Sequence, residues 1–280
     1  MDPQVVFAML AASLLHASWH ALVKVSGDQV VALAGMNLVS GTVALCALPL
    51  VAAPPGAAFG VIAGSVALHV GYKIALARLY RSADLAQAYP LARGTTPLAA
   101  AALGLAWLGE RPSGLGLAGL ALVSLGLLGL AFEKRRAPPP MRLLLAALAA
   151  GLAVAAYSVV DAYGVRLTGD WLAFTAWLVA ADSLAFVGYA VATRGASATR
   201  HWRIHWTRVL GTGLLGTVSF CVFRWALGRA PVGLVAALRE TSIAFAALIG
   251  VAILGERAGF VRIGASLTVM AGVATIALSR

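Results

Sequence analysis

Two stretches of this sequence decide its fold: AQAYPLARGTTPLAAA over residues 86–101 and GLVAALRETSIAFAAL over residues 233–248. Each stretch places one arginine, Arg93 or Arg239, in a mostly apolar run. Each arginine is followed, seventeen residues later, by the glutamate of an LGER tetrapeptide. Permanent charges within apolar segments are rare, so their recurrence in the same setting indicates that one unit occurs twice in the chain.

The composition places these stretches in a membrane protein. Of the 280 residues, 61% are hydrophobic and only 11% are charged, and the mean hydropathy is +0.91. A soluble domain carries roughly 25% charged residues, so this chain has too few polar residues to cover a soluble surface. Because the backbone in lipid must satisfy its own hydrogen bonds, the sequence predicts an all-α polytopic membrane protein.

The net charge of +11 falls mostly in short loops between apolar runs. Lys and Arg in such loops set the orientation of the helices and contact anionic headgroups. We therefore expect membrane lipid as a partner and no binding of nucleic acid. The loops richer in Lys and Arg predict that both termini lie outside the cell.

Ten apolar runs are long enough to cross a bilayer as helices. They cover residues 5–24, 29–51, 57–78, 84–108, 114–132, 143–166, 170–193, 208–228, 231–254 and 260–278. The polar stretch TRGASATRHWRIHWTR over residues 193–208 is predicted to be a loop at the headgroup level, with Trp202 and Trp206 as interfacial anchors.

The repeat extends beyond the two arginines. Residues 78–111 laid over residues 224–257 share the arginines, a threonine, several small residues and LGER. The copies fall in the fourth and ninth predicted helices, and this odd displacement of five helices means that the second copy crosses the bilayer in the opposite direction. We predict two inverted five-helix repeats, residues 1–136 and 143–280, around a central cavity, joined by a proline-rich linker over residues 137–142. Such repeats are typical of secondary transporters, whose binding site lies between them.

The segment LHASWHALVK over residues 15–24 and the LGER that ends helices 4 and 9 resemble the ten-helix EamA-type branch of the drug/metabolite transporter superfamily. The resemblance implies ten helices around a cavity and transport, often export, of amino acids, sugars or other small metabolites without nucleotide hydrolysis. Several ten-helix members have cytoplasmic termini, opposite to the charge distribution here. We expect a monomer in a bacterial inner (plasma) membrane.

Arg93 and Arg239 are the leading candidates for substrate binding. A guanidinium within a bilayer costs ~2.5–3.5 kcal/mol on insertion scales and stays charged, so each should face a wet cavity or a partner. The pair could bind a carboxylate or another anionic group of a substrate in bidentate fashion. Alternatively, each could be tied to carbonyls or an acid and lock helices together. Pro90 and Pro97 flank Arg93 and free backbone groups that could line a cavity.

Three acids within predicted helices are candidates for proton coupling: Glu240, Asp161 and Asp182. An acid in a medium of low dielectric constant binds a proton more readily, which suits a coupling role. The alternative is charge compensation for Arg239, Arg224 or Lys73, and we favour it for Asp161 and Asp182. Glu240, next to the repeated arginine, is the leading coupling candidate.

Further polar and aromatic residues could line the cavity. They are His16, Trp19, Tyr72, Lys73, Tyr89, Thr95, Tyr157 and Thr241. His16 and His20 lie one helical turn apart, which suits a shared metal, but no third ligand is spaced to join them, so we expect no metal and no other cofactor. Packing or an interhelical hydrogen bond is the alternative for each. Glu110 and Glu256 of LGER are interpreted as helix-end anchors.

These observations favour a secondary transporter that moves a small polar metabolite, with an anionic group favoured, by alternating access. The alternative within the class is an exporter of amino acids or amines that uses the intramembrane acids. A membrane-embedded enzyme has less support, because the sequence contains no Walker motif, no GxSxG motif and no zinc signature.

Overall fold

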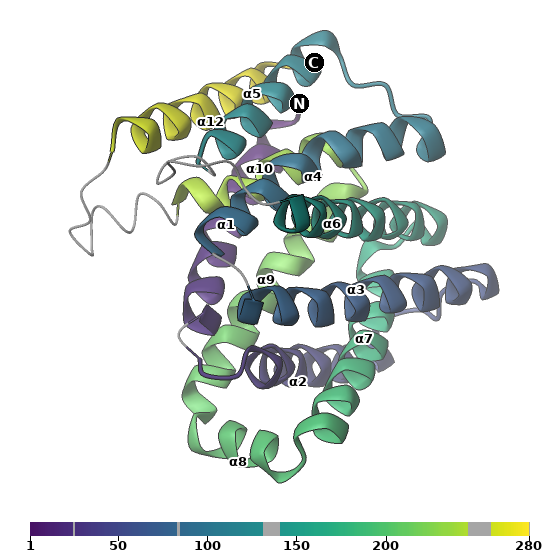
Figure 1. The fold of residues 1–280 in the computed structure, drawn as a ribbon. Helices are drawn as coiled ribbons and strands as arrows, with labels where there is room; N and C mark the ends of the chain where they lie inside the picture. Colours follow the sequence, from purple (N-terminus) through teal and green to yellow (C-terminus); the bar gives the residue numbers. More distant parts are fainter. Residues whose placement is uncertain (25, 83–84, 131–140, 246–258, 280) are drawn as a thin grey trace.

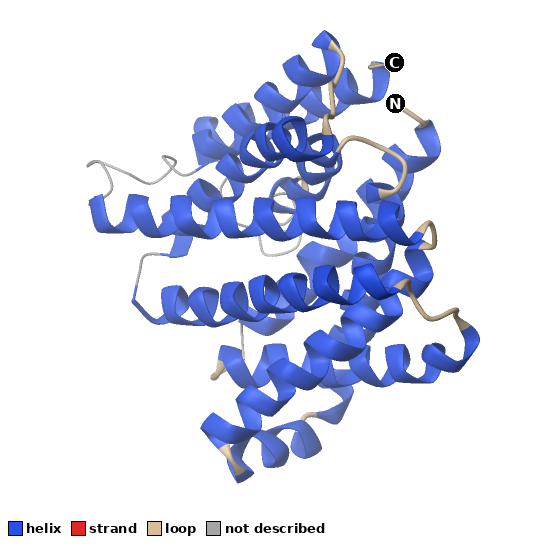
Figure 2. Cartoon of the chain, turned by 90° about the vertical axis from the view of Figure 1, so that its right-hand side faces the viewer, coloured by secondary structure: helices blue, strands red, loops and turns tan. Residues whose placement is uncertain are grey.

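The computed structural model describes residues 1–24, 26–82, 85–130, 141–245 and 259–279, and these residues form a bundle of helices (Figures 1 and 2). The first half contains α1 (Pro3–Lys24), α2 (Gln29–Ala47), the short 3-10 helix η1 (Leu48–Leu50), α3 (Gly56–Ser82), α4 (Leu85–Leu108) and α5 (Gly114–Leu130). The second half contains α6 (Met141–Thr168), α7 (Trp171–Arg194), α8 (Ala196–Ile204), α9 (Trp206–Leu227), α10 (Val232–Glu240) and α12 (Phe260–Leu278).

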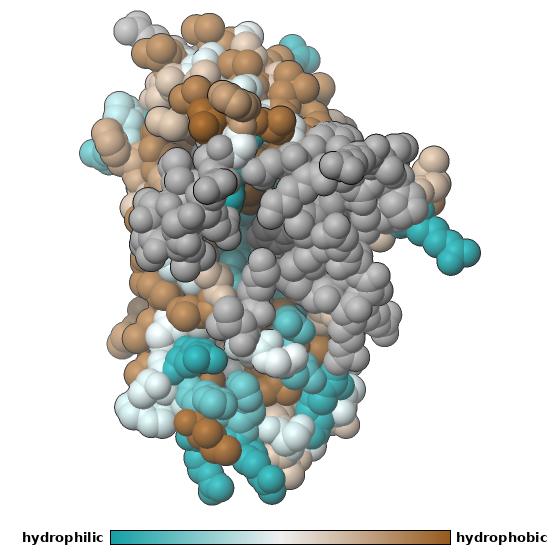
Figure 3. Space-filling view, turned by 60° about the vertical axis from the view of Figure 1, so that its left-hand side comes forward, coloured by the Kyte–Doolittle hydropathy of each residue, from teal (hydrophilic) through white to brown (hydrophobic). Residues whose placement is uncertain are grey.

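The all-helical prediction is confirmed for the described residues. Seven helices, α1, α2, α3, α6, α7, α9 and α12, are long and apolar enough to cross a membrane. Large apolar side chains such as Phe7, Trp107 and Phe260 are more than two-thirds exposed, as side chains that face lipid would be. Apolar residues cover much of one end of the surface in Figure 3, and the polar residues gather at the other end. The chain is an integral membrane protein.

The bounds of most helices differ from the predicted ones by only a few residues, and the ninth helix is the exception. It was predicted over residues 231–254, but α10 ends at Glu240, Thr241 forms a turn, and helical structure resumes over residues 242–245. The Thr241 hydroxyl donates to the carbonyl of Leu238 at 2.6 Å and so competes with the helical pattern. The rest of this prediction, with Glu256 and the second LGER, lies outside the described residues.

The predicted basic loop over residues 193–208 is wrong, because α8 occupies most of it. Trp202 does not serve as a free interfacial anchor: its Nε1 donates to the carbonyl of Val31 in α2 at 2.8 Å. Its ring lies against Gly35, where a Cβ would be only 2.9 Å from the indole. Trp206 is 61% exposed. Trp202 therefore attaches α8 to α2.

Helices from the two halves pack against one another throughout the bundle. Contacts join α1 with α9, α3 with α6, α2 with α7, and α4 with both α6 and α10. In Figure 1, α5 and α12 run side by side at the end of the bundle where both termini lie, and α8 lies at the opposite end. Small residues permit the closest contact, since Gly119 of α5 faces the backbone of Gly272 in α12.

Candidate functional site

A cavity of about 130 Å³ lies between helices of both halves. Side chains from α1, α2, α3, α4, α6, α7 and α9 line it. Its lining includes three histidines, three basic side chains and one acid: His16, His20, His69, Lys73, Arg93, Arg224 and Asp182. Its aromatic lining residues are Trp19, Tyr72, Tyr157 and Phe220. The cavity therefore combines three basic side chains, Lys73, Arg93 and Arg224, with aromatic walls inside a lipid-facing bundle.

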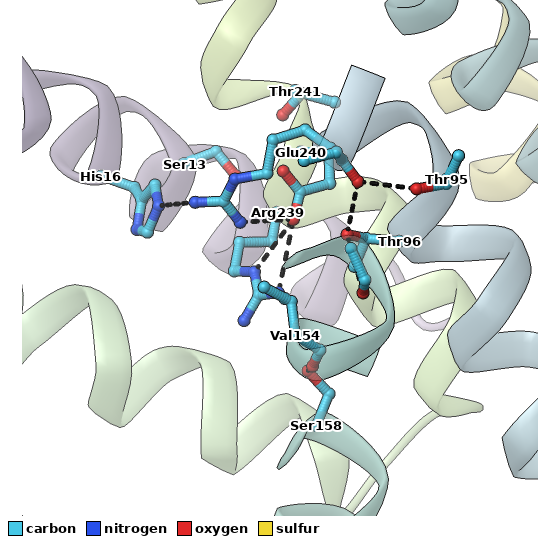
Figure 4. Close-up of polar contacts among 12 residues, drawn as sticks. Ser13, His16, Thr95, Thr96, Val154, Ser158, Arg239, Glu240 and Thr241 are labelled. Atoms are coloured by element: carbon cyan, nitrogen blue, oxygen red, sulfur yellow. Dashed lines mark hydrogen bonds and ion pairs between the residues drawn. The ribbon is translucent and has the colours of Figure 1, made fainter. Parts of the chain in front are cut away.

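Arg93 and Arg239 both donate to the carboxylate of Glu240. Figure 4 shows Glu240 together with Arg239 and His16. Arg93 donates from Nη1 to Oε1 of Glu240 at 2.9 Å, and the same oxygen accepts from Nε and Nη2 of Arg239 at 3.4 and 3.3 Å. Arg93 also donates from Nη2 to Nε2 of His16 at 3.2 Å. All four side chains are at least 95% buried. We call these four residues the Glu240 cluster, and it joins α1, α4 and α10.

The two arginines differ in their relation to the cavity. Arg93 lines it, whereas Arg239 is not among its lining residues. The Arg239 guanidinium lies 4.2 Å from the centre of the Phe223 ring and 5.7 Å from that of Tyr157, and Tyr157 does line the cavity. The structure therefore brings the repeated arginines together at Glu240 but presents only one of them to the cavity.

Asp161 of α6 forms the centre of a second buried group. It accepts a short hydrogen bond from the Ser65 hydroxyl and one from Nε2 of His69 at 3.2 Å. Nε of Arg224 lies 3.2 Å from Oδ2 of Asp161, as an ion pair without hydrogen-bond geometry. The His69 ring stacks on Tyr157 at 4.1 Å between centres. This group, the Asp161 cluster, connects α3, α6 and α9 beside the cavity.

Asp182 of α7 has a single ion-pair partner among the described residues, Lys73 of α3. Nζ of Lys73 donates to Oδ2 of Asp182 at 2.6 Å and to Oδ1 of Asn37 at 3.0 Å, and it lies 4.7 Å from the centre of the Phe186 ring. Oδ1 of Asp182 is buried and accepts no hydrogen bond within the described part of the chain. Each of the three intramembrane acids thus lies against a base, as charge compensation requires.

The aromatic end of the cavity is built on α1. The rings of Trp19 and His20 stack at 3.9 Å, and His16 meets the edge of Trp19 at 4.8 Å. Phe220 of α9 lies 6.1 Å from both Trp19 and His16. Nε1 of Trp19 is buried without a hydrogen-bond partner in the described residues. His16 therefore connects the Glu240 cluster to an indole that lines the cavity.

The other predicted site residues lie as follows. Tyr72 lines the cavity, and its ring centre is 5.8 Å from that of Tyr157. Thr95 and Thr241 donate to carbonyls of their own helices, Ala92 and Leu238, and neither lines the cavity. Tyr89 is in α4, but its side chain lies outside the described part of the structure.

Sequence reasoning considered Arg224 only as a partner for an acid. The structure places it in the cavity wall, 96% buried, near the end of α9. The repeat held the signal that could have found it, because Arg224 is the counterpart of Arg78 when the two copies are laid over one another. An arginine at this position is shared by both copies, although it lies further from the middle of the apolar run than Arg93 and Arg239 do.

Glu110 of the first LGER acts at a helix end. Its Oε2 accepts from the backbone N–H of Val232, the first residue of α10, at 2.8 Å, and Arg166 donates to its Oε1. Gly104 leaves space for this contact, since a Cβ there would be 2.7 Å from Oε2 of Glu110. Among the described residues, no three His, Cys, Asp or Glu side chains gather as a metal site.

Comparisons with known proteins give a family and a fold. Residues 141–278 match the sequence profile of the EamA-like transporter family. No curated protein sequence matches the chain. Among the solved structures that match, one described only as "Crystal structure of protein" is 18% identical, with a TM-score of 0.74 over 98% of this chain and 96% of that chain. At this identity, the likeness shows the fold alone.

Proposed function

The chain belongs to the EamA-like transporter family through residues 141–278, and from that premise we propose that it is a secondary transporter for a small metabolite with a carboxylate or other anionic group. The family is one of transporters and not of enzymes. One observation carries the choice of substrate: Lys73, Arg93 and Arg224 line a single internal cavity. Cationic groups in a site of low dielectric constant attract an anion more strongly than they would in water.

We also propose that the bundle consists of ten spans in two inverted five-helix repeats, residues 1–136 and 143–280. The helix contacts support this arrangement when α9, α10 and α12 count as the eighth, ninth and tenth spans. The contact of α1 with α9 then corresponds to that of α6 with α3, and the contact of α2 with α9 to that of α7 with α3. Such a pseudo-symmetry permits the cavity to open alternately to each side of the membrane.

Within this transporter, the Glu240 cluster is proposed to tie α1, α4 and α10 together, because one carboxylate accepts from two guanidinium groups. Asp182 is a better candidate for proton coupling than Glu240. It lines the cavity, has one buried oxygen with no hydrogen bond from the described residues, and is paired with a single lysine. We propose that the protein acts as a monomer in a bacterial inner membrane and that it exports its substrate.

Oδ1 of Asp182, which accepts no hydrogen bond from the residues that the structure describes, also favours a second candidate function, export of an amino acid. A substrate ammonium group could donate to Oδ1 of Asp182 while a cationic side chain binds its carboxylate. A carboxylic acid without an amine would leave that oxygen unused. The two candidates therefore differ in whether an amine is needed for binding.

The test is a ligand-stabilisation screen of the purified protein against carboxylates, phosphonates, amino acids and amines, followed by counterflow in liposomes with each hit. We expect acids to raise the unfolding temperature and to exchange across the membrane. An amino acid that stabilises the protein when the matching acid does not would favour the second candidate. If only amines stabilise and exchange, the proposed anionic substrate is wrong.

A further inference from the structure

We propose that Arg224, together with the indole N–H of Trp19, is the group that binds the substrate's carboxylate. This inference rests on the proposed transport function and names the binding residues within the cavity. The leading sequence candidates, Arg93 and Arg239, have guanidinium groups that already donate to Glu240. Arg224 donates no hydrogen bond to the described residues from Nε or Nη1, although both atoms are buried.

A buried guanidinium N–H without a partner is costly, so such a group is expected to meet water or a ligand. Arg224 lines the cavity and is 4% exposed. Its ion pair with Oδ2 of Asp161 at 3.2 Å lacks hydrogen-bond geometry, and Asp161 is already held by Ser65 and His69. The donors of Arg224 are therefore available to the planar pair of oxygens of a carboxylate, the geometry that guanidinium binds best.

Trp19 supplies the second donor from the opposite half of the chain. The residue lines the same cavity, and its Nε1 is buried and has no hydrogen-bond partner among the described residues. Phe220 is near both side chains: its ring centre is 5.7 Å from the Arg224 guanidinium and 6.1 Å from the centre of the Trp19 ring. An acid bound by both donors would place its apolar body against Phe220.

The size of the cavity limits the substrate. A volume of about 130 Å³ holds on the order of ten water molecules, so the substrate is a small organic acid of roughly ten non-hydrogen atoms or fewer. Lys73 and Asp182 line the same cavity and can contact polar groups elsewhere on the molecule. The chemical class is thus a small carboxylic acid with an apolar body, with or without a hydroxyl or amine.

The variants must separate binding from folding, because Arg224→Gln alone would leave the buried Asp161 without its guanidinium partner. The charge-balanced double variant Arg224→Gln/Asp161→Asn removes both members of the ion pair, and Asp161→Asn alone keeps the guanidinium. Trp19→Phe keeps an aromatic ring and removes only the N–H. Trp177→Phe is the matched control, since Nε1 of Trp177 is also buried and without a hydrogen bond in the described residues but lies outside the cavity.

Dissociation constants for acetate, glycolate, glycine and benzoate are measured by calorimetry on the purified full chain in detergent. A hydrogen bond to a charged group is worth ~1.5–3 kcal/mol, so the double variant should bind the acids at least about tenfold more weakly. Trp19→Phe should weaken binding about tenfold, while Asp161→Asn and Trp177→Phe should bind at least as tightly as the wild type.

Each result decides one question. If the wild type binds acids and the double variant, still folded, binds them equally well, the role of Arg224 is wrong while the proposed function stands. If Trp177→Phe weakens binding as much as Trp19→Phe does, the role of Trp19 is wrong. If the wild type binds none of the four acids and none of the larger acids in the screen, the proposed function itself fails.

Discussion

At the scale of single residues, the centre of the bundle depends on Glu240. Its carboxylate is fully buried and accepts hydrogen bonds from Arg93 and Arg239. A buried guanidinium is tolerated only when it is paired and hydrogen-bonded, and here one acid is the partner of two buried guanidinium groups. The asymmetry between the repeats, Gly94 after one arginine and Glu240 after the other, supplies this acid once for both copies.

We expect Glu240→Gln to destabilise the protein strongly. Removing one member of a buried ion pair costs ~3–5 kcal/mol because the remaining charge is uncompensated. The unfolding temperature in detergent should fall clearly. The double variant Arg239→Gln/Glu240→Gln removes one charge of each sign and should recover much of the loss. A double variant that is no more stable than Glu240→Gln would contradict this account.

At the scale of helices, close packing depends on small residues at defined positions. At the contact of α5 with α12, a Cβ on Gly119 would lie 2.7 Å from the carbonyl oxygen of Gly272 and 2.9 Å from the backbone nitrogen of Ile276. Backbone atoms cannot move aside as a flexible side chain can. The distance between these two helices is therefore set by the absence of a side chain.

Gly119→Ala should consequently lower the unfolding temperature, with a cost of ~1–3 kcal/mol for overpacking. The matched control is Gly188→Ala in α7, where a new Cβ would meet nothing within 4 Å. The control should leave stability unchanged or raise it slightly, since alanine favours helix more than glycine does. Equal destabilisation by both changes would show that the contact with Gly272 is not the cause.

The start of α2 supplies a pH-dependent contribution to stability. Oδ1 of Asp28 caps the helix by accepting from the N–H groups of Val30 and Val31, and Oδ2 accepts from Nε of Arg194 at 2.7 Å. Burial alone would raise the pKa of the Asp28 carboxyl, but these hydrogen bonds and the Arg194 charge outweigh it and lower the pKa below its ordinary 3.8.

A lowered folded-state pKa means that the unfolded chain binds this proton more readily. The contribution of Asp28 is therefore complete above about pH 4 and is lost as the pH falls through the folded-state pKa. We expect the unfolding temperature of the wild type to fall more steeply below about pH 4 than that of Asp28→Asn, which keeps the cap but carries no charge. Parallel pH profiles for the two proteins would rule out this contribution.

At the scale of the whole molecule, alternating access requires that the cavity become accessible to water. Cys221 lines the cavity, whereas Cys46 is exposed at the outside of the bundle. In the variant Cys46→Ser, a small hydrophilic methanethiosulfonate reagent should label Cys221, and acids that bind should slow the labelling severalfold. Labelling that proceeds at the same rate with and without a bound acid would place the substrate elsewhere.

Much of the fold could be predicted from the sequence because the bilayer restricts the choices. A long apolar run in lipid must be helical, so most helix bounds followed from where the apolar runs begin and end. The exceptions have local causes. The hydroxyl of Thr241 interrupts the ninth helix, and the stretch with Trp202 forms a short helix because its indole bonds to α2, a partner that is distant in the sequence.

The candidate site was predictable only in part. The sequence by itself determined which charges fall within apolar runs, because mostly apolar residues flank Arg93, Arg239 and Glu240. Which charge meets which was decided by the tertiary structure. Arg93 and Glu240 are 147 residues apart and meet because α4 packs on α10. The packing around α9 likewise leaves two buried nitrogens of Arg224 without a hydrogen bond from the described residues, since a side chain's partners depend on the helices around it and not on its neighbours in the chain.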